Sequence, residues 1–493
     1  MRQSGILMHI LSLPGKGGVG TLGQEAYDFV DFLKASGMQL WQMLPVGPTG
    51  YGESPYQCSS IFAGNPLMIS LPRLKEEGLL SFEESELFVP AREDQIDYAA
   101  VRANKELLLR RAFAQSEAKL ADELADFRKN YTWVDDFSLF TAVKHHFDDK
   151  MWSQWPDVSI RLYEAEAVKH YRALLDEDVR YHTFVQYLFF RQWFALKEYA
   201  NNNGVQLFGD MPIYVAEDSA DTWTRPDVFQ MDKNRVPRRV AGVPPDYFSA
   251  DGQLWGNPLY RWTYLKERDF DWWIDRMAAM GKMYDLIRID HFIGFANYFS
   301  IQHGAANARG GRWVIGPGKA LFRAFRKHLP NLNIIAEDLG CVNDRVLDLL
   351  KFCGYPGMRV LTFGFSGEED NVHLADNYVE NSGVYTGTHD NDTVRGWIDN
   401  ADEKTLAQAK EYLGFEEPED GPAACVEKVM ASVADRCVVP MQDVLGLGSE
   451  ARMNLPGTIG GNWMWRMLPG TTTAALAARL NDLTTRTNRR NAS

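Results

Sequence analysis

Four apolar runs of the sequence each end in an acidic residue, and this feature restricts the possible folds more than any other. The acids are Asp210, Asp290, Glu337 and Asp390. The runs alternate with segments of helical periodicity, which predicts repeated strand–helix units and a parallel sheet. In a (β/α)8 barrel the carboxyl ends of all strands converge on one face, so acids that are distant in the sequence would form a single site. In a doubly wound sheet they would be spread along an edge.

The number of strand–helix units decides between these two folds. About eight units over the chain favour an α/β fold of the (β/α)8 or TIM-barrel type, with helical and loop insertions as subdomains and no separate C-terminal β domain. We divide the chain into first barrel units with an aromatic loop (residues 1–85), a mostly helical insertion (86–180) and the remainder of the barrel (181–493). The last segment contains a long polar, glycine-rich loop without regular structure, residues 216–258, whose Trp and Tyr content argues against disorder.

The run at residues 286–290 carries a cation as well as an acid. A period of two places Leu286, Arg288 and Asp290 on one face of a strand. Arg288 is therefore predicted to pair with Asp290 and to keep its carboxylate ionised near neutral pH. An ionised carboxylate at the carboxyl end of a strand is a candidate nucleophile or base, although a purely structural ion pair explains this segment equally well.

Two further acidic positions leave alternatives open. Glu337 and Asp338 are neighbours on a strand, so only one of them can face the site, and the periodicity does not say which. His389 precedes Asp390, a pairing that suits either a metal ion or a hydroxyl-rich ligand. Because the sequence lacks H-E-x-x-H and C-x-x-C motifs and a second clustered His, we expect no metal and no cofactor, and we interpret His389 as a hydrogen-bond donor.

The glycine-rich residues 15–20 raise a nucleotide-binding alternative. Gly15, Gly17 and Gly20 fit the pattern G-x-G-x-x-G, but no Lys-Ser/Thr pair follows the last glycine and Pro14 stands at the entry of the loop. A plain loop is the favoured interpretation, and a nucleotide-dependent enzyme is kept only as the weakest of the functional hypotheses.

Charge and composition exclude several classes of partner and location. The net charge of −14 repels nucleic-acid phosphates and anionic lipids. No apolar run is long enough to span a bilayer, the first residues do not resemble a signal peptide, and five cysteines without close pairing suit a reducing compartment. We therefore expect a cytoplasmic protein, a monomer or weak homo-oligomer, without nucleic-acid or membrane partners.

Aromatic residues and carboxylates together favour carbohydrate chemistry. The chain has 14 Trp, 20 Tyr and 27 Phe, and many of the Trp lie in Gly- and Pro-rich segments where exposed rings can stack on the C–H faces of sugars. For any one Trp, a place in the core is the more common outcome. Several carboxylates without a metal motif or an activated Ser or Cys point to the glycosidic bond. Its cleavage needs one acid to protonate the leaving oxygen and one carboxylate to attack or to activate water.

Nine short motifs, distributed over nearly the whole chain, are recognisable as a set. They are SLPG (12–15), SPYQ (54–57), GDMPIYVA (209–216), GVPPDYFS (242–249), QLWGNP (253–258), RIDHF (288–292), AEDLG (336–340), GTHDNDT (387–393) and NLPGT (454–458). With these motifs the chain resembles the 4-α-glucanotransferases known as amylomaltases or disproportionating enzymes, which are relatives of the α-amylases.

The resemblance implies roles for particular residues. It implies that Asp290 is the nucleophile, that Glu337 rather than Asp338 is the acid/base, and that Asp390 binds sugar hydroxyls and supports the transition state. It also implies substrate-binding roles for six residues, which are Tyr56, Asp210, Trp255, Arg288, His291 and His389.

The activity implied by the resemblance is transfer. Such an enzyme moves α-1,4-glucan segments between maltooligosaccharides by a retaining double displacement with a covalent glycosyl-enzyme intermediate. The loop at residues 216–258 would cover the site and hold the acceptor, so that water competes poorly. The alternative from another class is a catalytically silent glucan-binding or regulatory protein on the same barrel, against which the intact set of Asp290, Glu337 and Asp390 argues.

Overall fold

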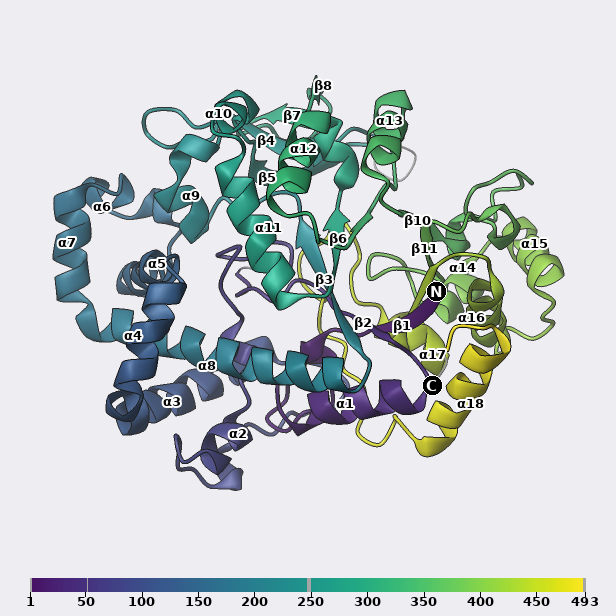
Figure 1. Cartoon of the computed structure of the whole chain (residues 1–493), viewed down its shortest axis with the longest axis horizontal. Coiled ribbons are helices and arrows are strands. Elements are labelled where there is room, and N and C mark those ends of the chain that lie inside the picture. Colours follow the sequence, from purple (N-terminus) through teal and green to yellow (C-terminus); the bar gives the residue numbers. More distant parts are fainter. Residues whose placement is uncertain (1, 51, 246–249, 491–493) are drawn as a thin grey trace.

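A parallel barrel forms the centre of the computed structural model, which describes residues 2–50, 52–245 and 250–490. Its eight strands lie in the spatial order β10-β11-β12-β1-β2-β3-β6-β9 (Figure 1). In chain order they are β1 (Gln3–Leu7), β2 (Leu40–Gln42), β3 (Gln206–Pro212), β6 (Leu286–Asp290), β9 (Ile334–Ala336), β10 (Gly357–Val360), β11 (Ser382–Tyr385) and β12 (Arg436–Pro440). The predicted (β/α)8 barrel is confirmed, and after β12 the described chain forms helices and loops without a further sheet.

The two end strands of the sheet, β9 and β10, are joined by hydrogen bonds that close the barrel. The N–H of Ala336 donates to the carbonyl of Pro356 at 2.9 Å. The N–H of Met358 donates to Asp338 Oδ1 at 2.7 Å, and Arg359 Nη1 lies 3.2 Å from Asp338 Oδ2. Asp338 therefore points toward β10, where its carboxylate bridges the seam of the barrel.

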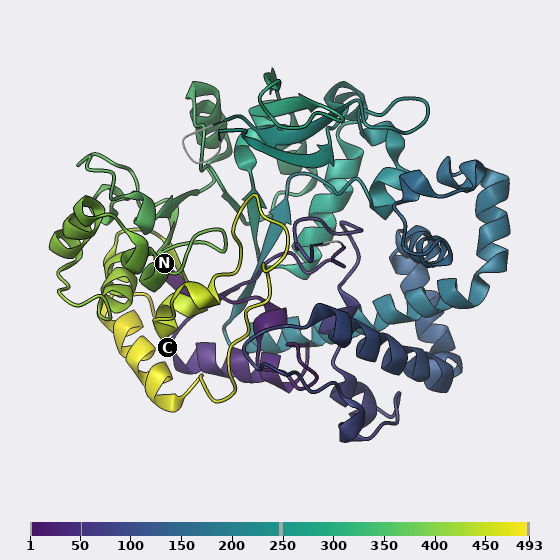
Figure 2. The ribbon, with the colours of Figure 1, turned by 180° about the vertical axis from the view of Figure 1, so that it is seen from behind.

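Helices lie outside the barrel strands, most of them against the barrel, with α10 beside the small sheet and α15 packed on α16 (Figures 1 and 2). They are α1 (Gln24–Ala35), α8 (Asp176–Asn202), α10 (Trp262–Glu267), α11 (Asp271–Met283), α12 (Lys319–His328), α13 (Asp344–Cys353), α14 (Val394–Asn400), α15 (Glu403–Leu413), α16 (Gly421–Ala431), α17 (Met441–Leu445) and α18 (Ala474–Arg486). Local sequence sets their ends: the Asn343 side chain accepts from the first N–H groups of α13, and Gly354, at φ 70°, ends that helix. Figure 2 shows α18 beside α1, so the last described helix packs on the first.

The chain between β2 and α8 adds a group of helices to one side of the barrel, drawn in blue in Figure 1. They are α2 (Leu71–Glu76), α3 (Tyr98–Ser116), α4 (Ala121–Asn130), α5 (Val134–His146), α6 (Val158–Arg161) and α7 (Ala165–Leu174). Trp152, Trp155 and Trp223 are fully buried in a second, smaller core on this side.

The division of the chain into three segments stays a prediction. Among the described residues, no helix combines the length and the apolar character needed to cross a bilayer.

A small antiparallel sheet lies beyond the barrel strands, at the top of Figure 1. Its strands, in spatial order, are β5 (Gln253–Pro258), β4 (Arg239–Val243), β7 (Asn297–Gln302) and β8 (Arg312–Ile315). The prediction that residues 216–258 lack regular structure is wrong, because α9 (Ala220–Thr224), β4 and β5 lie within them. These elements are short and contain Gly242 and Gly256, so the sequence does not show the regular spacing of apolar residues expected of a strand or helix. Residues 246–249 of the same segment lie outside the described residues.

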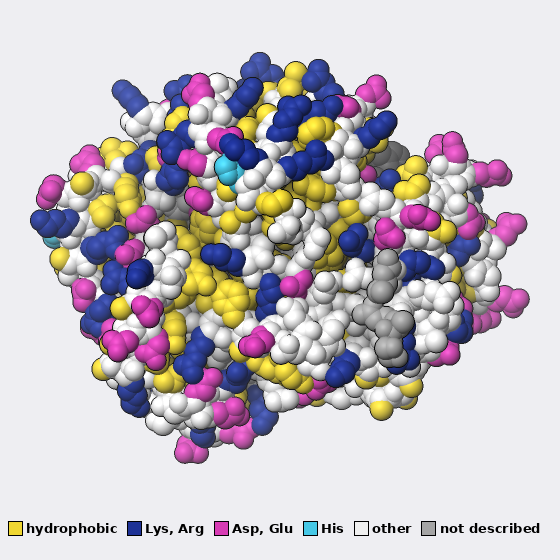
Figure 3. Space-filling model, viewed as in Figure 1, with side chains coloured by type: hydrophobic (Ala, Val, Ile, Leu, Met, Phe, Trp, Pro, Cys, Tyr) yellow, Lys and Arg dark blue, Asp and Glu magenta, His cyan; other side chains and the backbone are white. Residues whose placement is uncertain are grey.

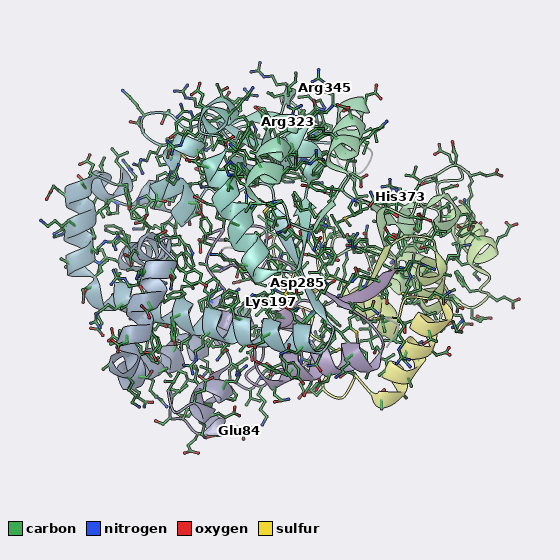
Figure 4. The ribbon with its side chains drawn as sticks, viewed as in Figure 1. Glu84, Lys197, Asp285, Arg323, Arg345 and His373 are labelled. Atoms are coloured by element: carbon green, nitrogen blue, oxygen red, sulfur yellow. The ribbon has the colours of Figure 1, made fainter. Side chains whose placement is uncertain are left out.

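The amino-terminal end of the barrel is held by an ion pair and amide hydrogen bonds. Lys197 and Asp285 lie side by side below β6 (Figure 4), with Nζ 3.3 Å from Oδ1. Asp285 Oδ2 also accepts from the side-chain amide of Asn201 and from the N–H of Leu207. These contacts tie α8 to β3 and β6, so this end of the barrel has a structural role.

Candidate active site

The predicted acids lie at the carboxyl ends of their strands, on one face of the barrel. Asp210 is in β3, Asp290 ends β6, Glu337 follows β9 directly and Asp390 follows β11 after a short loop. Arg288 joins the first two acids, since its Nη1 lies 2.7 Å from Asp210 Oδ2 and 3.0 Å from Asp290 Oδ1. The charge of Asp290 is in turn affected by Asp210, Glu337 and Asp390. The prediction that strand ends bring these acids together is therefore confirmed.

Asp210 is enclosed by protein groups. Its oxygens accept from Arg288 Nη1 at 2.8 and 2.7 Å, and Oδ2 also accepts from the hydroxyl of Tyr56 at 2.8 Å. The Asp210 side chain is 0% exposed. In this arrangement its carboxylate fixes the positions of Arg288 and Tyr56, and a direct contact between Asp210 and a sugar stays a prediction.

Opposing effects act on the charge of Asp290. Burial raises its pKa, the guanidinium of Arg288 lowers it, and the other carboxylates of the site raise it again. The result is a pKa well above the ordinary value for Asp. The predicted Arg288–Asp290 ion pair is confirmed by the 3.0 Å distance. That the pair keeps Asp290 ionised near neutral pH stays a prediction, since Arg288 and burial act on its charge in opposite directions.

Glu337 is held by the main chain. The N–H of His291 donates to Oε2 at 2.6 Å, and the N–H of Leu339 donates to Oε1 at 2.7 Å. Burial raises the pKa of Glu337 to about 7, against the lowering effects of Arg288 and of the two N–H groups. A carboxyl with this pKa can both give and take a proton at neutral pH. Of the adjacent pair, Glu337 lies near Asp290 while Asp338 joins β9 to β10.

Asp390 is the most exposed of the predicted catalytic acids and is positioned by a distant segment of the chain. Its side chain is 47% exposed. Asn454 Nδ2 donates to Asp390 Oδ1 at 2.7 Å, and Arg452 Nη2 donates to the Asp390 carbonyl at 2.8 Å. The N–H of Asn454 also donates to the carbonyl of His389. Sequence reasoning assigned no role to Asn454 or Arg452, although the motif at residues 454–458 was visible.

One group of rings contains His389. The ring of Tyr56 is stacked on His389 with centroids 5.0 Å apart, and Trp463 lies 6.0 Å from Tyr56 and 5.9 Å from His389. His389 Nε2 lies 3.4 Å from Asp390 Oδ1. Burial lowers the pKa of His389, so the neutral imidazole is favoured. Trp463 was missed, because its loop offers no periodic pattern in the sequence.

A second group of rings contains His291. Trp255 meets His291 edge to face, with centroids 4.9 Å apart, and Tyr214 lies 6.1 Å from Trp255. Through its N–H, His291 also connects this group to Glu337. The predicted site residues thus form two linked groups, one around Arg288 and His389 and one around Glu337 and His291.

The glycine-rich loop takes no part in this site. Glu25 Oε1 accepts from both the N–H and the hydroxyl of Thr21, and the carbonyl of Gly15 accepts from Arg466 Nη2. A carboxylate therefore occupies the place beside the loop N–H where a nucleotide would need to put a phosphate. This arrangement argues against the nucleotide-binding alternative.

Comparisons with known proteins converge on one family. The family model described as 4-alpha-glucanotransferase matches residues 8–472. The chain is 45% identical to the 4-alpha-glucanotransferase of Streptococcus pneumoniae serotype 4, over 98% of this chain and 97% of the relative, and 44% identical to that of Thermus thermophilus, over 99% of each. The solved amylomaltase of Streptococcus agalactiae, in complex with acarbose, is 42% identical over 100% of both chains with a TM-score of 0.97.

Proposed function

This chain belongs to the 4-alpha-glucanotransferase family designated glycoside hydrolase 77, and we propose that it transfers α-1,4-glucan segments between maltooligosaccharides with retention of configuration through a covalent glycosyl-enzyme. The observation that carries the proposal is Glu337, with a pKa raised to about 7, in one group of carboxylates with Asp290. A double displacement needs a group that gives and takes a proton beside a carboxylate that attacks carbon.

In the first half of the reaction Asp290 attacks the anomeric carbon of the donor. The bond between that carbon and the glycosidic oxygen breaks, and Glu337 gives its proton to the departing oxygen. Asp290 reacts as the anion, and Arg288 Nη1 at 3.0 Å stabilises that charge. Because the two carboxyl groups interact, the productive form has one proton, held by Glu337.

In the second half the 4-hydroxyl of an incoming glucan replaces Asp290. Glu337, now ionised, takes the hydroxyl proton while the oxygen attacks the anomeric carbon, and the bond to Asp290 breaks. Two inversions at the same carbon give a new α-1,4 bond. Asp390, with 47% of its side chain exposed, is available to bind sugar hydroxyls and to stabilise positive charge that develops on the ring.

The rings beside the carboxylates suit a glucan chain. Trp255 and the face of Tyr56 opposite His389 are the proposed stacking surfaces for sugar rings, and His291 and His389 offer hydrogen bonds. The described part of residues 216–258, which places Trp255 beside His291, would help to cover the site and keep water from competing with the acceptor. The cytoplasmic location, the lack of nucleic-acid partners and the monomeric or weakly oligomeric state stay predictions.

Incubation with maltotriose tests the transfer. We expect glucose and a ladder of longer maltodextrins, with a nearly constant number of reducing ends. A steady rise in reducing ends would identify a hydrolase instead. Binding of maltodextrin without any product would favour the silent glucan-binding alternative.

Trapping tests the covalent intermediate and the role of Asp290. In the Glu337→Gln variant, α-maltotriosyl fluoride can still react, because fluoride leaves without protonation, whereas the second half lacks its base. Mass spectrometry should find a maltotriosyl group on the peptide that contains Asp290, and none in the Glu337→Gln/Asp290→Asn double variant. Turnover of the fluoride with inverted product, or an adduct on another residue, would contradict the mechanism.

A further inference from the structure

The loop that carries Asp390 is bound at both of its ends by one side chain, that of Asp443. The hydroxyl of Thr386, the residue directly after β11, donates to Asp443 Oδ2 at 2.5 Å. The N–H of Val394, the first residue of α14, donates to Asp443 Oδ1 at 2.8 Å. Asp443 itself belongs to α17, which follows β12, the neighbour of β11 in the barrel. We call Thr386, Asp443 and Val394 the loop clamp.

A second contact, inside the loop clamp, brackets the two site residues of the loop. The side-chain oxygen of Asn391 accepts from both the N–H and the hydroxyl of Thr388, at 2.8 and 2.9 Å. Thr388 stands directly before His389 in the chain, and Asn391 stands directly after Asp390. Two nested sets of hydrogen bonds therefore enclose the main chain of His389 and Asp390, and the loop clamp is the outer set.

Packing alone does not hold this loop in place. A small cavity lies beside it, and its lining includes Thr388, His389, Thr393 and Asp443. Groups that border a cavity lack close-packed neighbours on that side, so hydrogen bonds must contribute more to their positions. Without the loop clamp, the loop would have room to shift into this space.

Asp443 is buried without a positively charged partner in the described part of the chain. On the face shown in Figure 3, Asp and Glu side chains lie among Lys and Arg side chains that offset their charge. Asp443 is only 3% exposed, and the groups that act on its pKa are Thr386, Val394 and Asp392, none of which is a cation. Burial raises the pKa of Asp443 to about 6. A buried carboxylate without a cation costs folding free energy, and such groups are typical of functional sites.

We propose that Asp443 is a positioning residue of the transfer reaction, which holds the main chain of the loop so that the carboxylate of Asp390 meets the sugar ring. The proposal rests on the proposed function, which gives Asp390 its role. Asn454 binds the side chain of Asp390, whereas Asp443 binds the two ends of the loop. Because Arg452 and Asn454 also contact carbonyls of the loop, removal of the loop clamp should displace Asp390 without releasing it.

Steady-state kinetics with maltotriose test the role of Asp443. Asp443→Ala should lower kcat about 10- to 100-fold, the loss expected for a catalytic group displaced by about 1 Å, with a smaller change in KM. Asp443→Asn keeps an oxygen for the N–H of Val394 and should restore most of the rate. The matched control is Asp157→Ala, at the start of the distant helix α6. Asp157 also accepts from one N–H and one hydroxyl, those of Ser159 and Tyr171, and its loss should lower the melting temperature without changing kcat.

A double-mutant cycle separates positioning from a general loss of structure. The donor is α-maltotriosyl fluoride, the acceptor is glucose, and the release of fluoride is measured. If Asp443 acts through Asp390, Asp443→Ala should cost less than about 2-fold in an Asp390→Asn background. Equal factors in the two backgrounds would overturn the proposal, and so would an unchanged kcat for maltotriose in Asp443→Ala.

Thr386→Val keeps the test decisive if Asp443→Ala does not fold. It removes one contact of the loop clamp at similar side-chain size and should lower kcat about 2- to 10-fold, the range for one hydrogen bond. The same cycle with Asp390→Asn applies to it, and an unchanged kcat would count against the loop clamp. A wild-type protein that makes no products from maltotriose would refute the proposed function and the role of Asp443 together. An active wild type with equal factors in the two backgrounds would refute the role of Asp443 alone.

Discussion

Glu337 accepts two main-chain hydrogen bonds and is almost completely buried. The hydrogen bonds and the burial shift its pKa in opposite directions. The N–H groups of His291 and Leu339 favour the carboxylate, while burial favours the neutral acid and prevails, so that the pKa is about 7. In the proposed mechanism the first half-reaction needs the protonated form. We therefore expect kcat/KM to fall as pH rises above about 7.

The raised pKa of Glu337 also predicts a cost to stability. The folded protein holds this proton up to about pH 7, whereas the unfolded chain releases it near 4.5. The free energy of unfolding therefore decreases as pH rises between these values, by up to about 3 kcal/mol. Glu337→Gln should remove this part of the pH dependence. The free energy of unfolding of the variant, relative to that of the wild type, should therefore increase from pH 4.5 to pH 8. Urea denaturation across that range measures the effect, and parallel curves for the two proteins would contradict it.

Asn454 offers a second test at a single side chain. Without the Asn454 amide, the half-exposed carboxylate of Asp390 is free to rotate. Asn454→Ala should lower kcat about 10- to 100-fold, the loss expected for a catalytic group displaced by about 1 Å, with a smaller change in KM. Asn454→Asp should lower kcat further, because it replaces the donated hydrogen bond with a like charge beside Asp390. Asn400→Ala, in the helix α14, is the control, and an unchanged kcat in Asn454→Ala would refute the positioning role.

Among the elements, the barrel strands that lead to the four acids were predictable, whereas β12 and the small sheet were not. The barrel strands are buried on both faces, so most of them read as apolar runs, and four of them carry an acid at or soon after the carboxyl end. In the small sheet β4 pairs with β5 and β7 pairs with β8, and the pairing of β4 with β7 that joins these two hairpins is non-local. The role of Asn454 was not recognised for the same reason, because its partner Asp390 is 64 positions away in the chain. The effect of burial on the pKa of Asp290 was not foreseen, because burial cannot be read from neighbouring residues.

The seam between β9 and β10 gives a prediction at this scale. Asp338 accepts the buried N–H of Met358 and pairs with Arg359. Asp338→Ala leaves that N–H without its acceptor and should lower the free energy of unfolding by about 1–3 kcal/mol. Asp338→Asn keeps an acceptor oxygen and should lose less. Chemical denaturation of both variants makes the comparison, and an equal loss for Ala and Asn would show that the hydrogen bond to Met358 is not what holds the seam.

In the molecule as a whole, the chain after α18 returns to the start of the barrel. Arg489 is 0% exposed and donates to the carbonyls of Gln3, Met430 and Ser432. The side-chain amide of Gln39 in turn donates to the carbonyl of Arg489. One guanidinium thus joins β1 to the segment before β12 at the amino-terminal end of the barrel.

Arg489→Ala should therefore destabilise the whole molecule. The substitution removes a fully buried donor from three carbonyls, of which those of Met430 and Ser432 keep a hydrogen bond from Arg2, and this predicts a loss of about 2–4 kcal/mol in the free energy of unfolding. Arg486→Ala is the matched control, because Arg486 is 52% exposed and makes surface ion pairs with Glu427 and Asp482. Its removal should cost less than about 1 kcal/mol. Similar melting temperatures for the two variants would mean that Arg489 does not hold the chain end in place.

The hydrogen bond from the N–H of His291 to Glu337 has a consequence for how the site tolerates change. His291 is the residue after Asp290, and its φ of 53° turns the chain at the end of β6. The carboxyl of Glu337 is therefore hydrogen-bonded to the main chain just after the strand that carries Asp290. This hydrogen bond restricts changes in the distance between the two carboxyl groups. In the proposed mechanism, substitutions in the surrounding loops can therefore change which glucans bind without changing the stereochemistry of the product.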